Sequence, residues 1–425
     1  MKAVVLAVHR DYIFDEDRPL ALIKVCGVSL IARILNSLKV AGIGEVLIVL
    51  GFRGEQISNL LKGGEKIDMR IRYLQAEGFE FPNIPQEFLN DDLLIISTNI
   101  VLDAEFLGEI IKMDDNVACY SNNEPIGVYK LKKESLKALQ SGETSNHLDK
   151  LMESMEISSL VKLDVSKMRV EHVELKREVF PICTRVEDEE SVELAKNKLI
   201  FRTQKGLHFT SYINKPIEDH VIYRVADVSW ITPNGITIFA NLIAFFVAVL
   251  FLVGYLEIAG ILAYVVGIID GLDGKLARAR GILTKLGYIE HTFDMLYEQV
   301  WYVCFAIGLY LKGYGYPPLL LGLFMLVVDS FVRHCYMQFR QTMGKALTAY
   351  TRFDRTFARI DGRRNVYVLY MIIFSWLQTP LYALYAMLAH SSLTALMYAI
   401  RSIQHLSAAD KSDGTKGFLK LVRKP

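Results

Sequence analysis

Long apolar segments in the second half of the chain constrain its fold more than any other feature of the sequence. Six mostly apolar runs, separated by turn residues or charges, occupy residues 236–253, 258–277, 288–311, 317–332, 365–377 and 381–400. A helix needs ~20 mostly apolar residues to cross a bilayer, and a helix satisfies its own backbone groups in lipid. We therefore predict an all-α membrane domain of six transmembrane helices over residues 233–405. The last break is placed at residues 378–380, with residues 390–392 as the alternative.

The first 200 residues have a different pattern, in which short β-rich runs alternate with helical spacing. Residues 2–8, 45–50, 69–74 and 93–97 are β-rich, whereas residues 30–40 and 54–61 have helical spacing. This alternation predicts an α/β domain with a parallel or mixed sheet over residues 1–200. Residues 201–232 are expected to form an amphipathic linker in the membrane interface, or otherwise a surface helix of the soluble domain. Residues 406–425 are expected to form a basic tail.

The charge and the cysteine content of the chain limit which cellular compartment and which partners are expected. The net charge of +1 provides no overall field that would favour nucleic acid. The five cysteines are scattered without a C-x-x-C pair, which argues against a disulfide framework or a zinc site. Basic residues follow the second and fourth apolar runs, whereas Lys312 is the only basic residue in the predicted loops on the opposite side of the membrane. The positive-inside rule therefore predicts an integral protein of the cell membrane, with both termini and the acids described next on the cytoplasmic side.

Four carboxylates lie at the ends of the second and third apolar runs. Asp270 and Asp273 share one helical face, and Glu290 and Asp294 are four residues apart at the start of the next run. Acids at membrane depth are costly and mark functional sites; solvated acids paired with nearby bases are the alternative. Four carboxylates in a low-dielectric site repel unless a cation binds, and oxygen ligands fit Mg²⁺ or Mn²⁺. With Arg278 available to a phosphate group, the pattern favours metal-assisted phosphoryl transfer.

The segment Asp270-Gly-Leu-Asp273-Gly274-Lys-Leu-Ala277-Arg278 closely resembles the signature D-x-x-D-G-x-x-A-R of the CDP-alcohol phosphotransferase family. Gly287 falls at the family's spacing, and the opening Thr232-Pro233-Asn234 is also family-like. The last two aspartates of the signature would fall at His291 and Met295, but this chain has Glu290 and Asp294, one residue earlier. We take the shifted pair as the functional acids; a register with His291 in the site is the alternative.

The resemblance implies roles for these residues. Mg²⁺ or Mn²⁺ would be held by Asp270, Asp273, Glu290 and Asp294, and Asp294 would also take the proton from an acceptor hydroxyl. A homodimer is the family-like expectation. Contacts to CDP are expected from Asp270, Asp273, Gly274, Ala277, Arg278 and Asn234. Apart from the resemblance, the basic cluster of Arg359, Arg363 and Arg364 suits a phosphorylated acceptor, with membrane anchoring as the alternative, and Asp329 and Arg333 are expected to pair.

The first 52 residues resemble the start of a sugar- or polyol-phosphate nucleotidyltransferase, through Lys24–Arg33 and Ala41–Phe52. Three catalytic places depart from that family. The family has a glycine-rich first loop, whereas the corresponding residues 7–13 of this chain contain no glycine. The family's metal-binding aspartate is replaced by Asn99. Where the family has acids near the end of the domain, this chain has Arg185-Val-Glu187. We therefore predict an inactive scaffold, with an active cytidylyltransferase as the alternative.

These observations lead to one functional prediction. The protein is expected to be an enzyme that transfers a substituted phosphate group from a CDP-alcohol to an acceptor alcohol, of the phospholipid or inositol-phosphate type, and releases CMP at the membrane. The domain order resembles archaeal enzymes that make CDP-inositol in one domain and a di-inositol phosphate in the other. The alternative from another class is a membrane transporter that uses the intramembrane acids to carry ions or protons.

Overall fold

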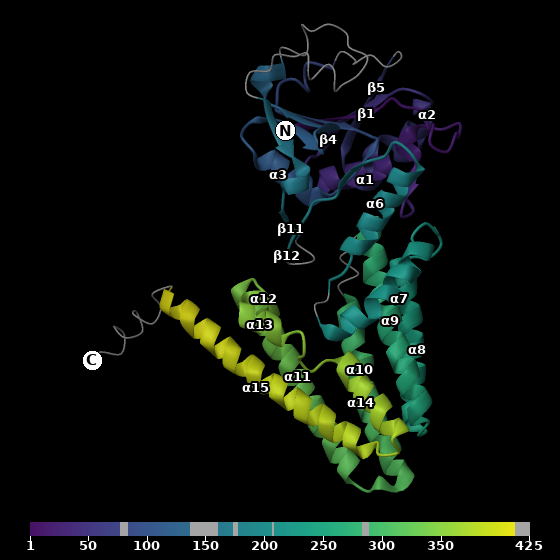
Figure 1. The fold of residues 1–425 in the computed structure, drawn as a ribbon, viewed down its shortest axis with the longest axis vertical. Helices are drawn as coiled ribbons and strands as arrows, with labels where there is room; N and C mark the ends of the chain where they lie inside the picture. Colours follow the sequence, from purple (N-terminus) through teal and green to yellow (C-terminus); the bar gives the residue numbers. More distant parts are fainter. Residues whose placement is uncertain (77–83, 137–159, 173–176, 206–207, 283–288, 413–425) are drawn as a thin grey trace, which may run out of the picture. The chain divides into compact units, whose positions relative to one another are not determined.

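The computed structural model describes residues 1–76, 84–136, 160–172, 177–205, 208–282 and 289–412. The chain divides into two compact units (Figure 1). Unit 1 comprises Met1–Gln204, Ile222–Trp230 and Lys275–Ile282, and unit 2 comprises Lys205–Val221, Ile231–Gly274 and Leu283–Pro425. Each unit is therefore built from several separate pieces of chain.

Unit 1 contains a mixed seven-stranded sheet with the strand order β10-β8-β9-β6-β1-β4-β5. Strand β1 is parallel to both β4 and β6, and β9 is antiparallel to both β6 and β8. The central strands are continuous apolar runs, as expected for strands buried on both faces. This sheet confirms the predicted α/β fold. Its strands are β1 (Lys2–Ala7), β4 (Glu45–Leu50), β5 (Arg70–Gln75), β6 (Leu93–Ser97), β8 (Asn116–Ser121), β9 (Glu124–Leu131) and β10 (Leu160–Asp164).

Helices and short ribbons complete unit 1. Helices α1 (Leu30–Val40) and α3 (Ala104–Lys112) pack on one face of the sheet (Figure 1). The buried residues Ile31, Ile34, Leu35 and Leu38 follow the helical period that predicted α1. The remaining elements are α2 (Gly54–Leu61), α6 (Glu189–Arg202), and the paired strands β2 (Lys24–Val25) with β3 (Val28–Ser29), β7 (Ile100–Leu102) with β13 (Cys183–Arg185), and β11 (Val170–His172) with β12 (Arg177–Val179).

Unit 1 also includes the last turn of a helix that begins in unit 2. This helix is α9 (Leu256–Arg280), of which Lys275–Arg280 belong to unit 1. The guanidinium Nη2 of Arg33 donates to the carbonyl oxygen of Ala279 at 3.1 Å, and Nδ2 of Asn36 donates to that of Gly281 at 2.8 Å. Side chains of α1 thus satisfy the carbonyl groups at the end of α9, which have no partner within the helix itself.

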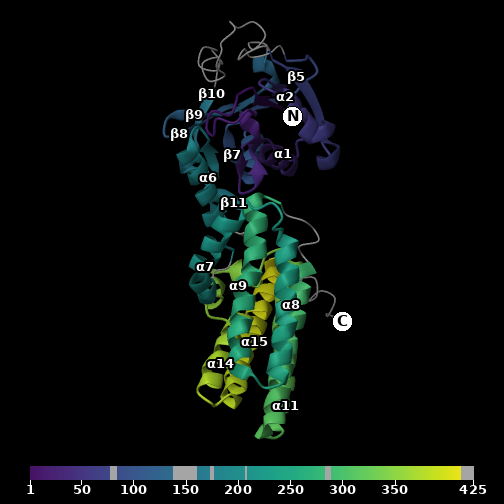
Figure 2. The same cartoon turned by 90° about the vertical axis from the view of Figure 1, so that its right-hand side faces the viewer.

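Unit 2 is helical. Thr232 caps α8 by accepting a hydrogen bond from the Gly235 N–H group at 3.1 Å, and Pro233 occupies the first turn. Helices α8 and α9 lie side by side in both views (Figures 1 and 2). The helices that contribute to unit 2 are α7 (Phe209–Val225), α8 (Pro233–Leu252), α9, α10 (Glu290–Leu309), α11 (Pro317–Met343), α12 (Leu347–Tyr350), α13 (Arg352–Phe357), α14 (Arg364–Trp376) and α15 (Leu381–Ser412).

Aromatic side chains of α10 form much of the core of unit 2. Tyr297, Trp301 and Phe305 are fully buried, and the Trp301 Nε1–H group donates to the carbonyl oxygen of Ala244 in α8 at 2.7 Å. A Cβ atom added at Gly308 would lie 2.1 Å from the Phe251 carbonyl oxygen. Glycine is therefore required for the close approach of α10 to α8, as is common where membrane helices pack together.

Among the residues that the structure describes, three helices are long and apolar enough to cross a membrane, namely Pro233–Leu252, Pro317–Met343 and Leu381–Lys411. The predicted helical C-terminal half is thus confirmed, whereas the count of six transmembrane helices is not. Helices α9 and α10 fill two of the other predicted runs but carry acids, and α14 has only 13 residues. The break before α15 lies at residues 377–380, so His390 lies inside a helix.

Candidate functional site

The acids of the second apolar run lie on α9, in the part of that helix that belongs to unit 2. Asp273 is 2% exposed, and the hydroxyl of Thr237 in α8 donates to its Oδ2 atom at 2.5 Å. The sequence analysis assigned no role to Thr237. The N–H group of Gly274 donates to the other oxygen, Oδ1. These two donors fill only part of the lone pairs of a buried carboxylate.

Asp270, one turn before Asp273, contacts an arginine from the start of α14. The Nη2 atom of Arg364 donates to Asp270 Oδ2 at 2.6 Å. Arg364 also donates to the Tyr297 hydroxyl, and its Nη1 atom lies 3.2 Å from Glu298 Oε1. An arginine predicted to bind the acceptor is therefore bound to one of the predicted metal ligands.

Helix α10 presents a further acid that the sequence analysis missed. Asp294 is 8% exposed and Glu298, one turn later, is 5% exposed. Both lie on the same face as the buried Tyr297 and Trp301. Glu298 continues the four-residue spacing of Glu290 and Asp294, and that spacing could have identified it. The side chains of Glu290 and His291 lie outside the described residues, so the choice between the two registers stays a prediction.

A second arginine extends this network of charges. Arg333 in α11 donates to Glu298, and its Nε atom donates to Asp329 Oδ2 at 2.8 Å, which confirms the predicted pair. Gln299 Nε2 also donates to Asp329 Oδ2, at 3.3 Å. Buried charges in a helical bundle are stable only when paired in this way.

The rest of the predicted acceptor cluster is divided. Two N–H groups of Arg363 donate to the Asp361 carboxylate, Nε to Oδ1 at 2.5 Å and Nη2 to Oδ2 at 2.9 Å. Tyr398 donates to the same Oδ2 atom at 2.5 Å. Arg359 is exposed. His208 lies beside this pair, with Nε2 3.2 Å from the Asp361 carbonyl oxygen, and burial together with the Arg363 charge lowers its pKa to about 4.

The other residues predicted to contact CDP lie in different surroundings. Asn234 is exposed in the first turn of α8, and Gly274 is half-buried in unit 2. Ala277 and Arg278 belong to unit 1, where the Arg278 Nε–H group donates to the Thr203 carbonyl oxygen at 2.8 Å.

The donor atoms of this site fit Mg²⁺ or Mn²⁺, because carboxylate oxygens are the ligands that hard cations prefer. Among the described side chains, however, no three from His, Cys, Asp or Glu are gathered closely enough to hold a metal ion. Asp270 is bound by Arg364, and Asp273 by Thr237. The ligand type thus fits, while a guanidinium group occupies part of the ligand set.

In unit 1, the residues at the predicted nucleotidyltransferase site are engaged with one another. The fully buried Asp11 carboxylate accepts hydrogen bonds from the N–H groups of Ile13 and Phe14, both at 3.0 Å, and from Arg18 Nε at 2.9 Å. Asn99 Oδ1 accepts from the Ser97 hydroxyl at 2.6 Å. A loop that folds around its own carboxylate differs from the ring of free N–H groups that cradles a triphosphate.

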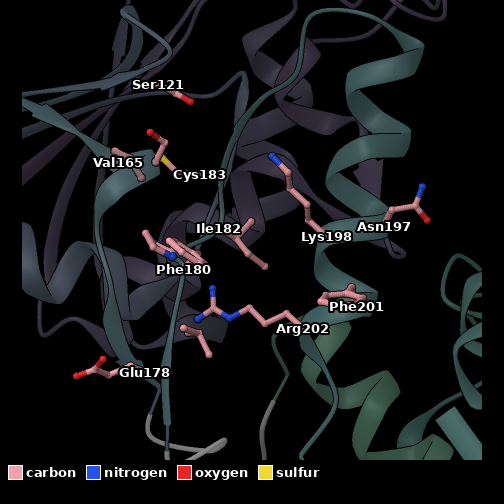
Figure 3. A pocket seen from close by; sticks show the side chains of 13 residues that line it. Ser121, Val165, Glu178, Phe180, Ile182, Cys183, Asn197, Lys198, Phe201 and Arg202 are labelled. Atoms are coloured by element: carbon pink, nitrogen blue, oxygen red, sulfur yellow. The ribbon is translucent and has the colours of Figure 1, made fainter. Parts of the chain in front are cut away.

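Unit 1 also contains a cavity of ≈ 730 Å³ (Figure 3). Lys198 and Arg202 reach into it from α6, and Arg202 is paired with Asp103. The rings of Phe180 and Phe201 at its edge are exposed. The lining includes neither Asn99 nor Arg185, nor any residue of the 7–13 loop. The cavity lining therefore does not include the residues that stand at the nucleotidyltransferase family's catalytic places.

Comparison with known proteins gives matches for both halves of the chain. Residues 230–403 match the CDP-alcohol phosphatidyltransferase family. The bifunctional IPC transferase and DIPP synthase of Aquifex aeolicus is 23% identical over 364 residues, which cover 76% of this chain and 80% of that protein. The protein of the same name from Thermococcus kodakarensis is 29% identical over 151 residues, which cover 35% of this chain and 34% of that protein.

Two solved structures resemble separate parts of the chain at low similarity. A putative glucose-1-phosphate thymidylyltransferase of Bacillus anthracis has 13% identity and a TM-score of 0.35, covering 46% of this chain and 93% of that one. The phosphatidylinositol phosphate synthase of Mycobacterium tuberculosis has 18% identity and a TM-score of 0.36, covering 45% of this chain and 94% of that one.

Proposed function

We propose that the protein transfers a substituted phosphate group from a CDP-alcohol to an acceptor hydroxyl and releases CMP, because residues 230–403 match the CDP-alcohol phosphatidyltransferase family. The observation that carries this proposal is the complete D-x-x-D-G-x-x-A-R segment on α9, inside the matched region. The burial of Asp273 and Asp294 supports it, since buried acids in a helical bundle are retained for function.

The carboxylates of Asp270, Asp273, Glu290 and Asp294 would hold Mg²⁺ or Mn²⁺, which would neutralise the pyrophosphate of the donor and make its phosphorus more electrophilic. The Thr237 hydroxyl fixes the orientation of Asp273. Partners of this kind orient ligands and tune their basicity.

Asp294 would act as the general base. It accepts the proton of the acceptor hydroxyl while the acceptor oxygen forms a bond to the β-phosphorus of the donor. The bond between that phosphorus and the bridging oxygen breaks, and CMP leaves with the electron pair. The burial of Asp294 suits this role, because water is kept from competing with the acceptor hydroxyl for the carboxylate.

For the substrates, we propose that CDP contacts Asp270, Asp273, Gly274, Ala277, Arg278 and Asn234, and that Arg359, Arg363 and Arg364 favour a phosphorylated polyol as acceptor. The name shared by the two relatives supports an inositol-phosphate type of substrate over a membrane phospholipid. The ion pairs of Arg363 and Arg364 weaken the case for a preformed acceptor pocket, since both guanidinium groups must first leave a carboxylate.

We also retain the predicted organisation: residues 1–200, 201–232, 233–405 and 406–425 as soluble domain, interfacial linker, six-helix membrane domain and tail, in a homodimer with cytoplasmic termini. Exposed apolar side chains on α8, such as Phe239, Leu242 and Phe246, suit contact with lipid. The soluble domain is proposed to be catalytically inactive. The relatives' bifunctional name favours an active cytidylyltransferase as the second candidate, which release of pyrophosphate from CTP and a polyol phosphate would reveal.

The test is release of CMP by the purified full-length protein in detergent. A panel of lipid and water-soluble CDP-alcohols is combined with a panel of acceptors in Mg²⁺, and CMP is quantified by chromatography. We expect release with at least one pair and loss of that release in Asp270→Asn. If no pair yields CMP while the protein stays folded, the proposal fails, and ion flux in proteoliposomes becomes the measurement to make for the transporter alternative.

A further inference from the structure

Arg364 occupies a position that the proposed function assigns to a metal ion. Its guanidinium group bonds to Asp270 at 2.6 Å and lies 3.2 Å from Glu298. The side chains of Arg364, Asp270 and Glu298 are 13%, 15% and 6% exposed. We infer that Arg364 is a tethered cation that neutralises Asp270 before the metal ion arrives and leaves Asp270 when the ion binds. This inference rests on the proposed metal site.

The balance of charge around Asp270 supports this inference. The guanidinium groups of Arg364 and Arg333 are paired with members of a set of five carboxylates, which are those of Asp270, Asp273, Asp294, Glu298 and Asp329. Buried carboxylates repel one another unless cations lie between them. Asp270 is thus a predicted metal ligand that a guanidinium group already neutralises. A metal ion that binds Asp270 therefore meets a cation that is already in place.

Arg364 also has other partners within reach. When it leaves Asp270, its Nη1 edge still faces Glu298, and it still donates to the Tyr297 hydroxyl. Glu298 is held in turn by Arg333. Release of Asp270 therefore does not leave a buried guanidinium without a partner, which would be the main obstacle to movement.

The contact between Arg364 and Asp270 also has a consequence for the order in which the metal ion and the acceptor bind. A metal ion and Arg364 compete for the same carboxylate, so each weakens the binding of the other. An Arg364 that has left Asp270 can turn its Nη2 group toward a phosphate group, while its Nε atom keeps a long contact of 3.3 Å with Asn365 Oδ1. The geometry therefore points to an order in which the metal ion binds first and the anionic acceptor second, with Arg364 as the residue that couples the two events.

The experiment measures Mn²⁺ affinity directly, by electron paramagnetic resonance of the ion with the purified full-length protein and no substrate. We expect Arg364→Gln to bind Mn²⁺ roughly ten-fold more tightly than the wild type, as for a typical coupling between two sites. In EDTA the same variant should unfold at a lower temperature than the wild type, because Asp270 has lost its cation, and Mn²⁺ should restore most of the difference.

Arg333→Gln is the matched control. This substitution removes the same charge. The Arg333 side chain also contacts Glu298, but its carboxylate partners are Glu298 and Asp329 rather than Asp270. If both variants tighten Mn²⁺ binding equally, the effect is general electrostatics and the inference is wrong. Unchanged or weaker Mn²⁺ binding in Arg364→Gln also overturns it. Should Arg364→Gln fail to fold, Arg364→Lys replaces it, since lysine cannot hold two carboxylates in a fork, and an intermediate tightening is expected.

A second arm tests the proposed coupling. Glycerol 3-phosphate, used as a phosphorylated polyol probe, should tighten Mn²⁺ binding in the wild type but not in Arg364→Gln. Equal effects in both proteins would remove Arg364 from the coupling. These outcomes are separate from the proposed function. Mn²⁺ binding with the predicted Arg364 dependence but no CMP release would reject the function and keep the inference, whereas CMP release without any Arg364 dependence of Mn²⁺ binding would do the reverse.

Discussion

The two units each contain a place where the sequence suggested catalysis, and the polar groups in those places are arranged differently. In unit 1, Asp11 and Asn99 accept hydrogen bonds from their own loops. In unit 2, the half-buried Asp270 is neutralised by Arg364, an arginine 94 positions away. This difference is what we expect if unit 1 is an inactive scaffold, in which former site residues serve local structure. It is also what we expect if unit 2 holds a working site, which keeps acids where burial makes them costly.

The largest expected effect tests the unit 2 side of this comparison. Asp294→Asn removes the proposed base with little change of shape, and we expect CMP release to fall by ~10³-fold. Circular dichroism and the thermal unfolding temperature should remain close to those of the wild type. If the variant retains more than about a tenth of the activity, another group takes the proton, and the register with His291 in the site becomes the better interpretation.

A structural acid in unit 1 should behave in the opposite way. The Asp103 carboxylate accepts from the Ile182 N–H group at 2.6 Å and the Phe106 N–H group at 2.8 Å, and pairs with Arg202. Asp103→Asn removes the closer of two carboxylate partners of Arg202 and leaves it with Glu105 at 3.8 Å, so we expect a loss of ~3 kcal/mol in the free energy of unfolding of unit 1. Denaturant titration followed by reactivity of buried thiols would measure it. CMP release per folded molecule should change little; its loss would show that unit 1 participates in the chemistry.

The buried histidine before α7 predicts a dependence of stability on pH. The pKa of His208 is lowered to about 4 from the ordinary value of 6.5, by burial and by Arg363. Below pH 6.5 the unfolded chain therefore binds a proton that the folded protein does not. Stability is constant above that pH and falls as the pH drops toward 4, by ~2 kcal/mol at pH 5. Thermal unfolding of the wild type and of His208→Gln across this range would show it, and identical pH profiles would contradict it.

The smallest expected effect concerns a residue that orients an acid. Thr237→Val removes the hydroxyl that donates to Asp273 and keeps the side-chain volume. Loss of such a partner of a metal ligand costs ~10-fold or somewhat more in metal affinity or activity. The Mn²⁺ affinity and the rate of CMP release should both fall. Thr342→Val on α11, where the hydroxyl donates only to a backbone carbonyl in its own helix, is the control and should have no effect.

The sequence was most informative where structure depends on neighbours along the chain. The strands of the sheet, α1, the Thr232 cap, the Asp329–Arg333 pair and the break before α15 all follow from local spacing. The spacing of four residues from Asp294 to Glu298 was available but was not used.

Contacts between distant helices could not be predicted in the same way. Periodicity shows which face of a helix is polar but not which other helix meets it. The bonds from Arg364 to Asp270 and from Thr237 to Asp273 depend on how α14 and α8 pack against α9. The number of membrane spans was also uncertain for a physical reason, since the acids proposed to form the site lower the hydropathy of α9 and α10.

The last turn of α9 limits how this protein can be divided into separately folded fragments. Residues 275–282 and 222–230 belong to unit 1, and Arg33 and Asn36 donate to carbonyl groups at Ala279 and Gly281. A fragment that ends near residue 204 would keep the whole sheet but expose these donors and the surface that received them. No single cut of the polypeptide separates the two units, so a soluble version of unit 1 would need a redesigned connection that keeps all three pieces.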